Sequence, residues 1–184
     1  MASPAHGLAR FCRAIDTFTE FTGRAVSWLT LALVLVTCTV VILRYVLSSG
    51  SIALQETMSY LHATLFMLGI AFTLKRGGHV RVDVFYRGFS PRRQALVDVL
   101  GTLFFLLPVS VLILVYCWDY VLSSWAIRET SSEGGGLPLV YLLKTLMLVM
   151  PVTLVIQGVS EAIKNGLFFL GLGGSHTEEH LGPI

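Results

Sequence analysis

The sequence has little charge for its length. Asp, Glu, Lys and Arg make up 13% of the 184 residues, whereas 54% are hydrophobic and the mean hydropathy is +0.75. A soluble domain carries about 25% charged residues, so this chain has too few to coat a globule. It also lacks a basic patch with interleaved aromatic residues, which excludes nucleic acid as an expected partner. These absences favour a membrane protein without a separate soluble domain.

Residue patterns for catalysis are absent as well. The three cysteines, Cys12, Cys38 and Cys117, are isolated and form no Cys-x-x-Cys pair. This excludes a thiol oxidoreductase, which needs paired cysteines. The glycine-rich stretches 77–78 and 134–136 lack the Gly-Lys-Ser/Thr ending of a phosphate-binding loop. No Ser-His-Asp set or carboxylate pair is placed for catalysis. We therefore predict that the chain is not an enzyme.

Histidine is too sparse for a haem or metal site. His62 is the only histidine inside a predicted span, and a bis-histidine haem would need a second one at membrane depth. His176 and His180 lie four residues apart, but a metal site also needs further ligands and fixed geometry. The tail after Gly171 is Gly-rich and then polar, which predicts disorder. We expect no metal and no cofactor on this chain.

What the sequence does contain is four long apolar runs. They cover residues 25–43, 57–74, 99–118 and 137–160, and residues 52–56 form the mouth of the second. Each run can cross about 30 Å of hydrocarbon at ~1.5 Å per residue. We therefore predict an all-α membrane protein with four transmembrane helices. The alternative for the first run is a cleaved signal sequence, but that run exceeds the usual ~7–15 residues.

Prolines mark two further features of the predicted helices. Ser90 and Pro91 have the residue types of an N-cap and a first helical position, so the third helix is expected to begin near Pro91. Pro108 and Pro151 lie inside the third and fourth spans, where proline kinks a helix.

The segment before the first span has its own pattern. Its charged residues Arg10, Arg13, Asp16 and Glu20 fall largely on one side of a helix. Its apolar residues follow helical spacing on the other side and are Leu8, Phe11, Cys12, Ile15, Phe18 and Phe21. This pattern predicts an amphipathic helix in the membrane interface. A cytoplasmic cap packed on another subunit explains it equally well. The chain is thereby divided into an N-terminal helix and tail (1–24), a four-helix transmembrane domain (25–163) and a cytoplasmic C-terminal tail (164–184).

The positions of Lys and Arg predict the orientation. The loop at 75–97 is rich in them, whereas the loops at 44–56 and 119–136 hold one each, Arg44 and Arg128. The N-terminal segment adds Arg10, Arg13 and Arg24. The positive-inside rule then places both termini and the 75–97 loop of this multi-pass protein in the cytoplasm.

Polar residues near the predicted spans are candidate contact residues. Gln55, Ser59 and His62 form a stripe on the second helix that must face protein, either the bundle interior or a partner. Glu56 could pair with Arg44, or each could be solvated. Lys144 could extend its ammonium group toward the membrane surface unpaired, or pair with an acid, and pairing is favoured. The four candidate acids are Glu56, Asp119, Glu129 and Glu133. No carboxylate lies near mid-span, so the chain is a poor transporter by itself.

Several of these stretches resemble a known family. The longest is Lys75-Arg76-Gly77-Gly78-His79-Val80-Arg81-Val82-Asp83, and the shorter stretches Leu43-Arg44-Tyr45, Gln55-Glu56 and Leu68-Gly69 precede it. Together they resemble the small membrane subunit of tripartite ATP-independent periplasmic (TRAP) transporters, the DctQ-like family. Leu137-Pro138, Lys144, Pro151 and Gln157-Gly158 resemble the last helix of that family. The resemblance covers residues 28–163.

The resemblance implies a function that composition does not show. Family members pair with a large multi-span transport subunit, which carries the substrate and sodium, and a periplasmic binding protein delivers the substrate, often an organic acid. The small subunit is implied to be a scaffold that braces the large one and helps dock the binding protein. A free-standing four-helix transporter or channel is the alternative, and it would need polar residues lining a pore through several spans.

We therefore expect this chain to contact the large transport subunit, the periplasmic binding protein and membrane lipid. The candidate partner-contact or structural residues are Arg44, Gln55, Glu56, Ser59, His62, Gly77, Gly78, His79, Arg81, Asp83, Arg128, Glu129, Glu133 and Lys144.

Overall fold

The computed structural model describes residues 4–79, 86 and 88–171. These residues form the helices α1 (Pro4–Tyr45), α2 (Ile52–Lys75), α4 (Pro91–Gly101), α5 (Leu107–Ile127) and α6 (Val140–Phe169), and the π-helical segment η1 (Thr102–Leu106) joins α4 to α5. Four helical stretches are long and apolar enough to cross a membrane, namely 7–45, 52–75, 91–127 and 140–169. The predicted all-α class is therefore confirmed for the described residues, and each predicted run lies largely within a helix that is long and apolar enough to cross a membrane.

Most helix ends lie beyond the predicted runs, whereas α6 begins at Val140, three residues after the predicted start at 137. The 42 residues of α1 include both the first span and the segment before it. At ~1.5 Å per residue this helix is about 63 Å long, roughly twice the thickness of the hydrocarbon, so much of α1 lies beyond it. A place for residues 4–24 in the membrane interface remains a prediction, as does the division of the chain into three segments.

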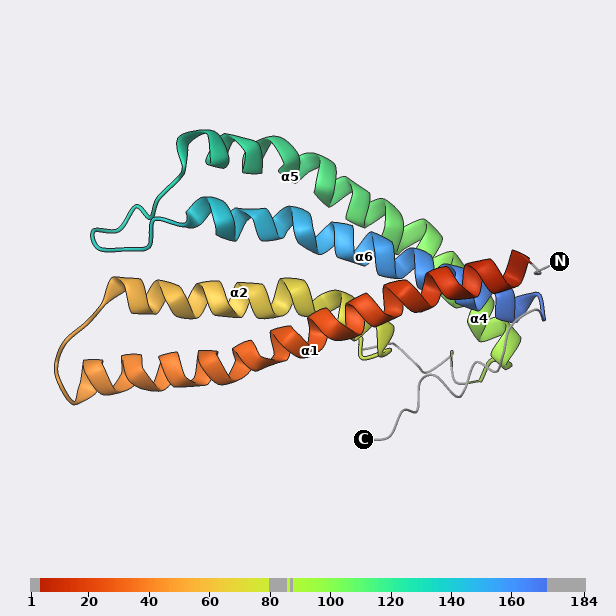
Figure 1. Ribbon diagram of the computed structural model, residues 1–184, viewed down its shortest axis with the longest axis horizontal. Coiled ribbons are helices and arrows are strands. Elements are labelled where there is room, and N and C mark those ends of the chain that lie inside the picture. The colour runs from red at the N-terminus through yellow and green to blue at the C-terminus, as the bar shows by residue number, and fades with distance from the viewer. Residues whose placement is uncertain (1–3, 80–85, 87, 172–184) are drawn as a thin grey trace.

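The helices form an open layer rather than a closed bundle. In Figure 1 the order across the layer is α5, α6, α2 and α1; α6 packs against both α5 and α2, and α2 packs against α1. The N-terminal half of α1 crosses the layer to contact α6 as well, near α4. We call the end with residues 46–51 and 128–139 the loop end, and the end with the N-terminus and α4 the terminal end (Figure 1).

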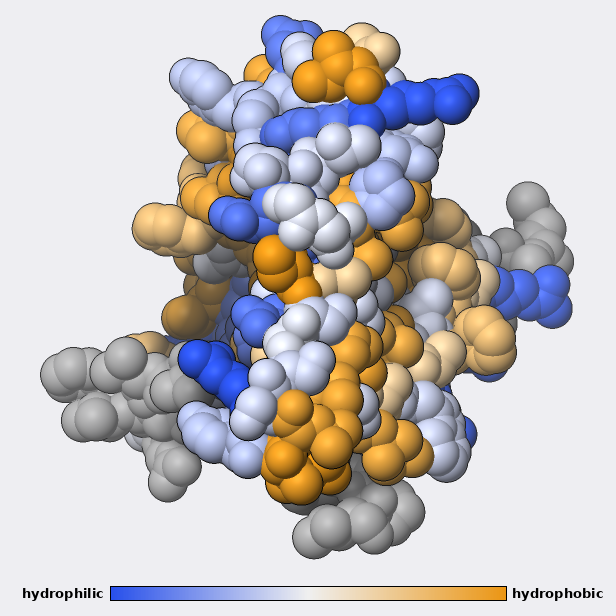
Figure 2. Space-filling model, turned by 90° about the vertical axis from the view of Figure 1, so that its left-hand side faces the viewer, coloured by the Kyte–Doolittle hydropathy of each residue, from blue (hydrophilic) through white to orange (hydrophobic). Residues whose placement is uncertain are grey.

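Because the layer is open, many apolar side chains remain exposed. Large hydrophobic residues of α1, η1 and α5 are uncovered along most of their length, including Trp28, Leu35, Phe105, Val115 and Tyr116. Figure 2 looks onto the loop end, where hydrophilic and hydrophobic side chains are interspersed and hydrophobic ones also reach the sides of the molecule. This distribution suits helices whose sides meet lipid or another apolar protein surface.

Small residues allow the helices to approach closely at two points. A Cβ on Gly23 of α1 would lie 2.7 Å from the Cβ of Phe72 on α2, and one on Gly158 of α6 would lie 2.6 Å from Cδ2 of Leu106. Leu106 is the last residue of the π-helical segment, which ends two residues before Pro108. Proline has no N–H and clashes with the carbonyl four residues earlier. Pro108 therefore widens the helix locally, and the N–H of Leu107 bonds to the carbonyl of Thr102, five residues back.

Two other expectations about proline can be compared with the structure. The third helix does begin at Pro91, with Ser90 as its N-cap, although the Ser90 side chain makes no capping hydrogen bond. Pro151 is buried inside α6, which continues as helix on both sides of it.

Candidate functional site

A tight turn at the loop end brings an acid back onto α6. Arg128 caps α5 in the left-handed conformation, with φ 46°, and the N–H of Glu129 bonds to the carbonyl of Ser124 at 3.0 Å. After this turn, Glu129 accepts a hydrogen bond from the ammonium group of Lys144. The Lys144 nitrogen also lies 4.0 Å from the ring centroid of Tyr120 on α5. The predicted pairing of Lys144 is confirmed, and Glu129 is its partner.

This ion pair also affects the acid itself. The hydrogen bond from Lys144 favours the ionised form of Glu129 and lowers its pKa below the ordinary value. The two other candidate residues of this loop, Arg128 and Glu133, are exposed. The backbone of Glu133 helps to close the loop, because its N–H donates to Oγ of Ser131 at 3.1 Å and its carbonyl accepts from Gly136 at 3.0 Å.

Glu56 of α2 anchors the same loop from the other side. It accepts a hydrogen bond from the Ser131 hydroxyl and another from the backbone N–H of Leu137 at 2.6 Å. A Cβ on Gly136 would lie 2.7 Å from Oε1 of Glu56, so this close approach requires glycine. Among the ion pairs of the described residues none joins Glu56 to Arg44, which lies exposed at the end of α1. Neither predicted arrangement of Glu56 holds, since it binds the loop between α5 and α6.

A second polar cluster joins α1 to α6 at the terminal end. Asp16 is buried and accepts hydrogen bonds from Nε2 of Gln157 at 2.9 Å, from Oγ of Ser160 at 3.3 Å and from Nζ of Lys164 at 3.1 Å. Gln157 is fully buried, and its Oε1 accepts a hydrogen bond from Thr19 at 2.7 Å. We call these five residues the α1–α6 polar cluster.

Glu20 continues this contact toward α2. It pairs with Lys75 at 2.8 Å and Arg76 at 2.5 Å at the C-terminal end of α2, and with Arg24 of α1 at 3.0 Å. The sequence pattern separated Asp16 and Glu20 from the apolar residues of this segment. In the structure Asp16 is buried together with the apolar Cys12 and Ile15, and Asp16 and Glu20 face other helices, while Phe11, Phe18 and Phe21 are exposed. Helical periodicity identifies two faces but does not tell which one another helix covers.

The residues that complete this cluster were not found from the sequence. Gln157, Ser160 and Lys164 lie at i, i+3 and i+7, so they form one polar row on α6. A row of that kind, matched to Asp16 and Thr19 on another helix, is the signal that could have identified the contact.

The glycines of the family-like motif end helix α2. Gly77 has φ 61°, its N–H bonds to the carbonyl of Leu74, and the N–H of Gly78 bonds to the carbonyl of Thr73. These are the two bonds of a Schellman cap, which favours glycine at the left-handed position. His79 follows and is exposed. Arg81 and Asp83 lie outside the described residues.

The predicted stripe on α2 points away from the other helices. Gln55, Ser59 and His62 are all exposed, and the His62 ring contacts Phe66 with 4.6 Å between centroids. Of the two surroundings expected for this stripe, the interior of the chain is therefore excluded.

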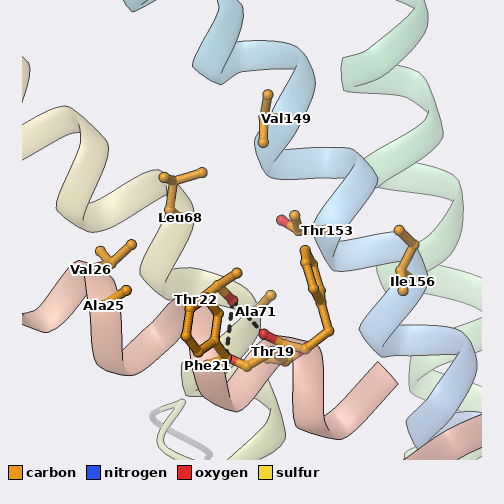
Figure 3. Close-up of a pocket in the computed structure, with 11 residues that line it drawn as sticks. Thr19, Phe21, Thr22, Ala25, Val26, Leu68, Ala71, Val149, Thr153 and Ile156 are labelled. Atoms are coloured by element: carbon orange, nitrogen blue, oxygen red, sulfur yellow. Dashed lines mark hydrogen bonds between the residues drawn. The ribbon is translucent and has the colours of Figure 1, made fainter. Parts of the chain in front are cut away.

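One cavity lies between α1, α2 and α6. It has a volume of about 210 Å³ and is lined mainly by apolar side chains, including Phe21, Val26, Leu68 and Val149 (Figure 3). The hydroxyls of Thr22 and Thr153 bond to their own helix backbones, and that of Thr19 bonds to Gln157. The cavity therefore offers a hydrophobic surface.

In the described part of the chain, no group of three or more His, Cys, Asp or Glu residues could hold a metal ion.

Comparison with known proteins identifies one family. The family model described as "Tripartite ATP-independent periplasmic transporters, DctQ component" matches residues 33–166, close to the stretch in which the resemblance was seen. Neither the curated proteins nor the solved structures gave a match.

The ion pair at the loop end leads to a test of its role. In the variant Lys144→Met, Glu129 loses its cation, so the thermal unfolding temperature of the purified protein in detergent should fall. Adding Glu129→Gln should recover part of that loss, because no unpaired charge then remains. Glu133→Gln, which changes an exposed acid of the same loop, is the control and should have little effect. An unfolding temperature unchanged by Lys144→Met would show that the pair does not stabilise the fold.

Proposed function

Since the chain belongs to the family of DctQ components of tripartite ATP-independent periplasmic transporters, we propose that it braces the large transport subunit and helps to dock the binding protein. In this proposal the large subunit carries substrate and sodium, and the complete transporter moves an organic acid or similar small solute by sodium symport. The observation that carries the proposal is the exposed row of Gln55, Ser59 and His62, which needs a protein partner in the membrane.

The charged contacts of the chain support an accessory role. The acids Glu20 and Glu129 and the lysines Lys144 and Lys164 are engaged in contacts between helices or with the adjoining loop. Such pairs hold the layer together rather than line a path for an ion. A free-standing transporter would require a polar path across the membrane, whereas the cavity among α1, α2 and α6 is largely apolar.

The loop end is the surface that we propose to meet the binding protein. Residues 131–137 are closed by a backbone hydrogen bond of 3.1 Å from Ser131 to Leu137 and are anchored to α2 by Glu56. Lys144 and Glu129 fix the start of the same loop. A loop held at both ends presents a preformed surface, which lowers the ordering cost of docking.

We propose that both termini face the cytoplasm and that the loop end faces the periplasm, in the inner membrane. The support is the excess of Lys and Arg in the segment after α2. Single cysteines at positions 79 and 132, in a background without the three native cysteines, should react oppositely with a membrane-impermeant thiol reagent in intact cells. Position 132 should be labelled; labelling of position 79 alone would reverse the orientation.

Reconstitution tests the proposed function. In vesicles with an inward sodium gradient and substrate, the chain alone should give no uptake, because the coupling site is on the large subunit. The large subunit, the binding protein and this chain together should give uptake, and omission of this chain should abolish it. As a control, substrate binding by the soluble protein should be the same with and without the chain. Sodium-driven uptake by this chain alone would contradict the accessory role.

A further inference from the structure

One face of α2 stands out by its exposure and its chemistry. The exposed residues of this helix are Ile52, Gln55, Ser59, His62 and Phe66, which are spaced three or four residues apart. They therefore form one line along the helix, here called the α2 row. The remaining residues of α2 are buried or half-buried against α1, α6 and the loop.

The polar members of the α2 row have no hydrogen-bond partner within the described part of the chain. The hydroxyls of Thr57, Thr64 and Thr73 on the same helix each donate to the carbonyl four residues back, at 2.7, 2.7 and 3.1 Å. By contrast, no hydrogen bond of this kind involves the side chains of Gln55, Ser59 or His62 among the described residues. The threonines satisfy themselves within α2, whereas the polar groups of the row do not.

The depth of the row decides what can cover it. His62 lies ten residues after the start of α2, or about 15 Å along the helix, which is near the middle of ~30 Å of hydrocarbon. Lipid tails offer no hydrogen bonds at that depth, so an imidazole there needs a polar protein partner. Between Phe105 of η1 and Val115 of α5 the exposed face of the third span is apolar and can meet lipid, whereas the exposed Asp119 lies one turn nearer the loop end.

We propose that the α2 row is the contact surface for a transmembrane helix of the large transport subunit. This inference rests on the proposed function. A neutral imidazole, an amide and a hydroxyl can each donate and accept hydrogen bonds, so the partner helix presents a hydroxyl, amide or carboxyl group opposite His62. Gly69, about two turns beyond His62, adds room for close approach, because a Cβ there would meet nothing within 4 Å.

The family description points to an unlike partner rather than a second copy of the chain. The family is described as one component of a tripartite transporter, so a second membrane component is expected beside it. A second copy would also satisfy these side chains, because each can hydrogen-bond to a group of its own kind; the crosslinking experiment below distinguishes the two occupants.

Photo-crosslinking in the complete transporter tests the assignment. Phe66 of the row and Phe105 in the third helix are both exposed, at 65% and 73%, and each can be replaced by p-benzoylphenylalanine, which is similar in shape. Irradiation should attach the large subunit to position 66 but not to position 105. Attachment of a second copy of this chain at position 66, or of the large subunit at position 105 alone, would overturn the assignment.

A second measurement separates the contact from the proposed function. His62→Leu should lower recovery of the large subunit with the tagged chain by ~10-fold, equivalent to about 1.4 kcal/mol, with no loss in its own thermal stability. Val115→Leu on α5 is the control and should leave recovery unchanged. If the native chain recovers the large subunit but His62→Leu recovers it equally well, the contact is wrong and the proposed function stands. If even the native chain recovers no large subunit, both fail.

Discussion

Lipid cannot hydrogen-bond to a protein, and this constraint governs where the chain puts its polar groups. Most of those within reach of the membrane bind a neighbouring helix or their own backbone. Asp16 gathers Gln157, Ser160 and Lys164 around it, and Lys144 meets Glu129. Among the described residues, the buried hydroxyl of Tyr60 has no hydrogen-bond partner, about two turns from the start of α2. The polar side chains of the α2 row also lack a partner in this part of the chain and are exposed, as is the carboxylate of Asp119 on α5, nearer the loop end.

The same contacts explain how an open layer keeps its shape. At the loop end, Glu56 ties α2 to the loop between α5 and α6. At the terminal end, Glu20 ties α1 to α2, and Asp16 ties α1 to α6. Apolar packing alone is weak in selecting one arrangement of helices in lipid, because lipid tails are as apolar as the side chains. Polar links at both ends of the layer favour one arrangement and leave the α2 row facing outward.

The sequence predicts the spans well because uncharged length is what a membrane requires. It predicts their ends less well: α1 continues through Asp16 and Glu20, whose charges are paired by other helices. That Lys144 is paired also follows from the sequence, but its choice among four acids depends on the left-handed turn at Arg128. The α1–α6 polar cluster was missed because periodicity along one helix does not identify its neighbour.

The central claim is that this chain is incomplete until a larger membrane protein covers it. The most direct measurement is the native mass of the assembly that contains the tagged chain, extracted from its own membrane in a mild detergent. The account predicts a complex that holds the 20.2 kDa chain together with a polypeptide several times larger. A mass that corresponds to this chain alone, or to several copies of it without a larger polypeptide, would contradict the account.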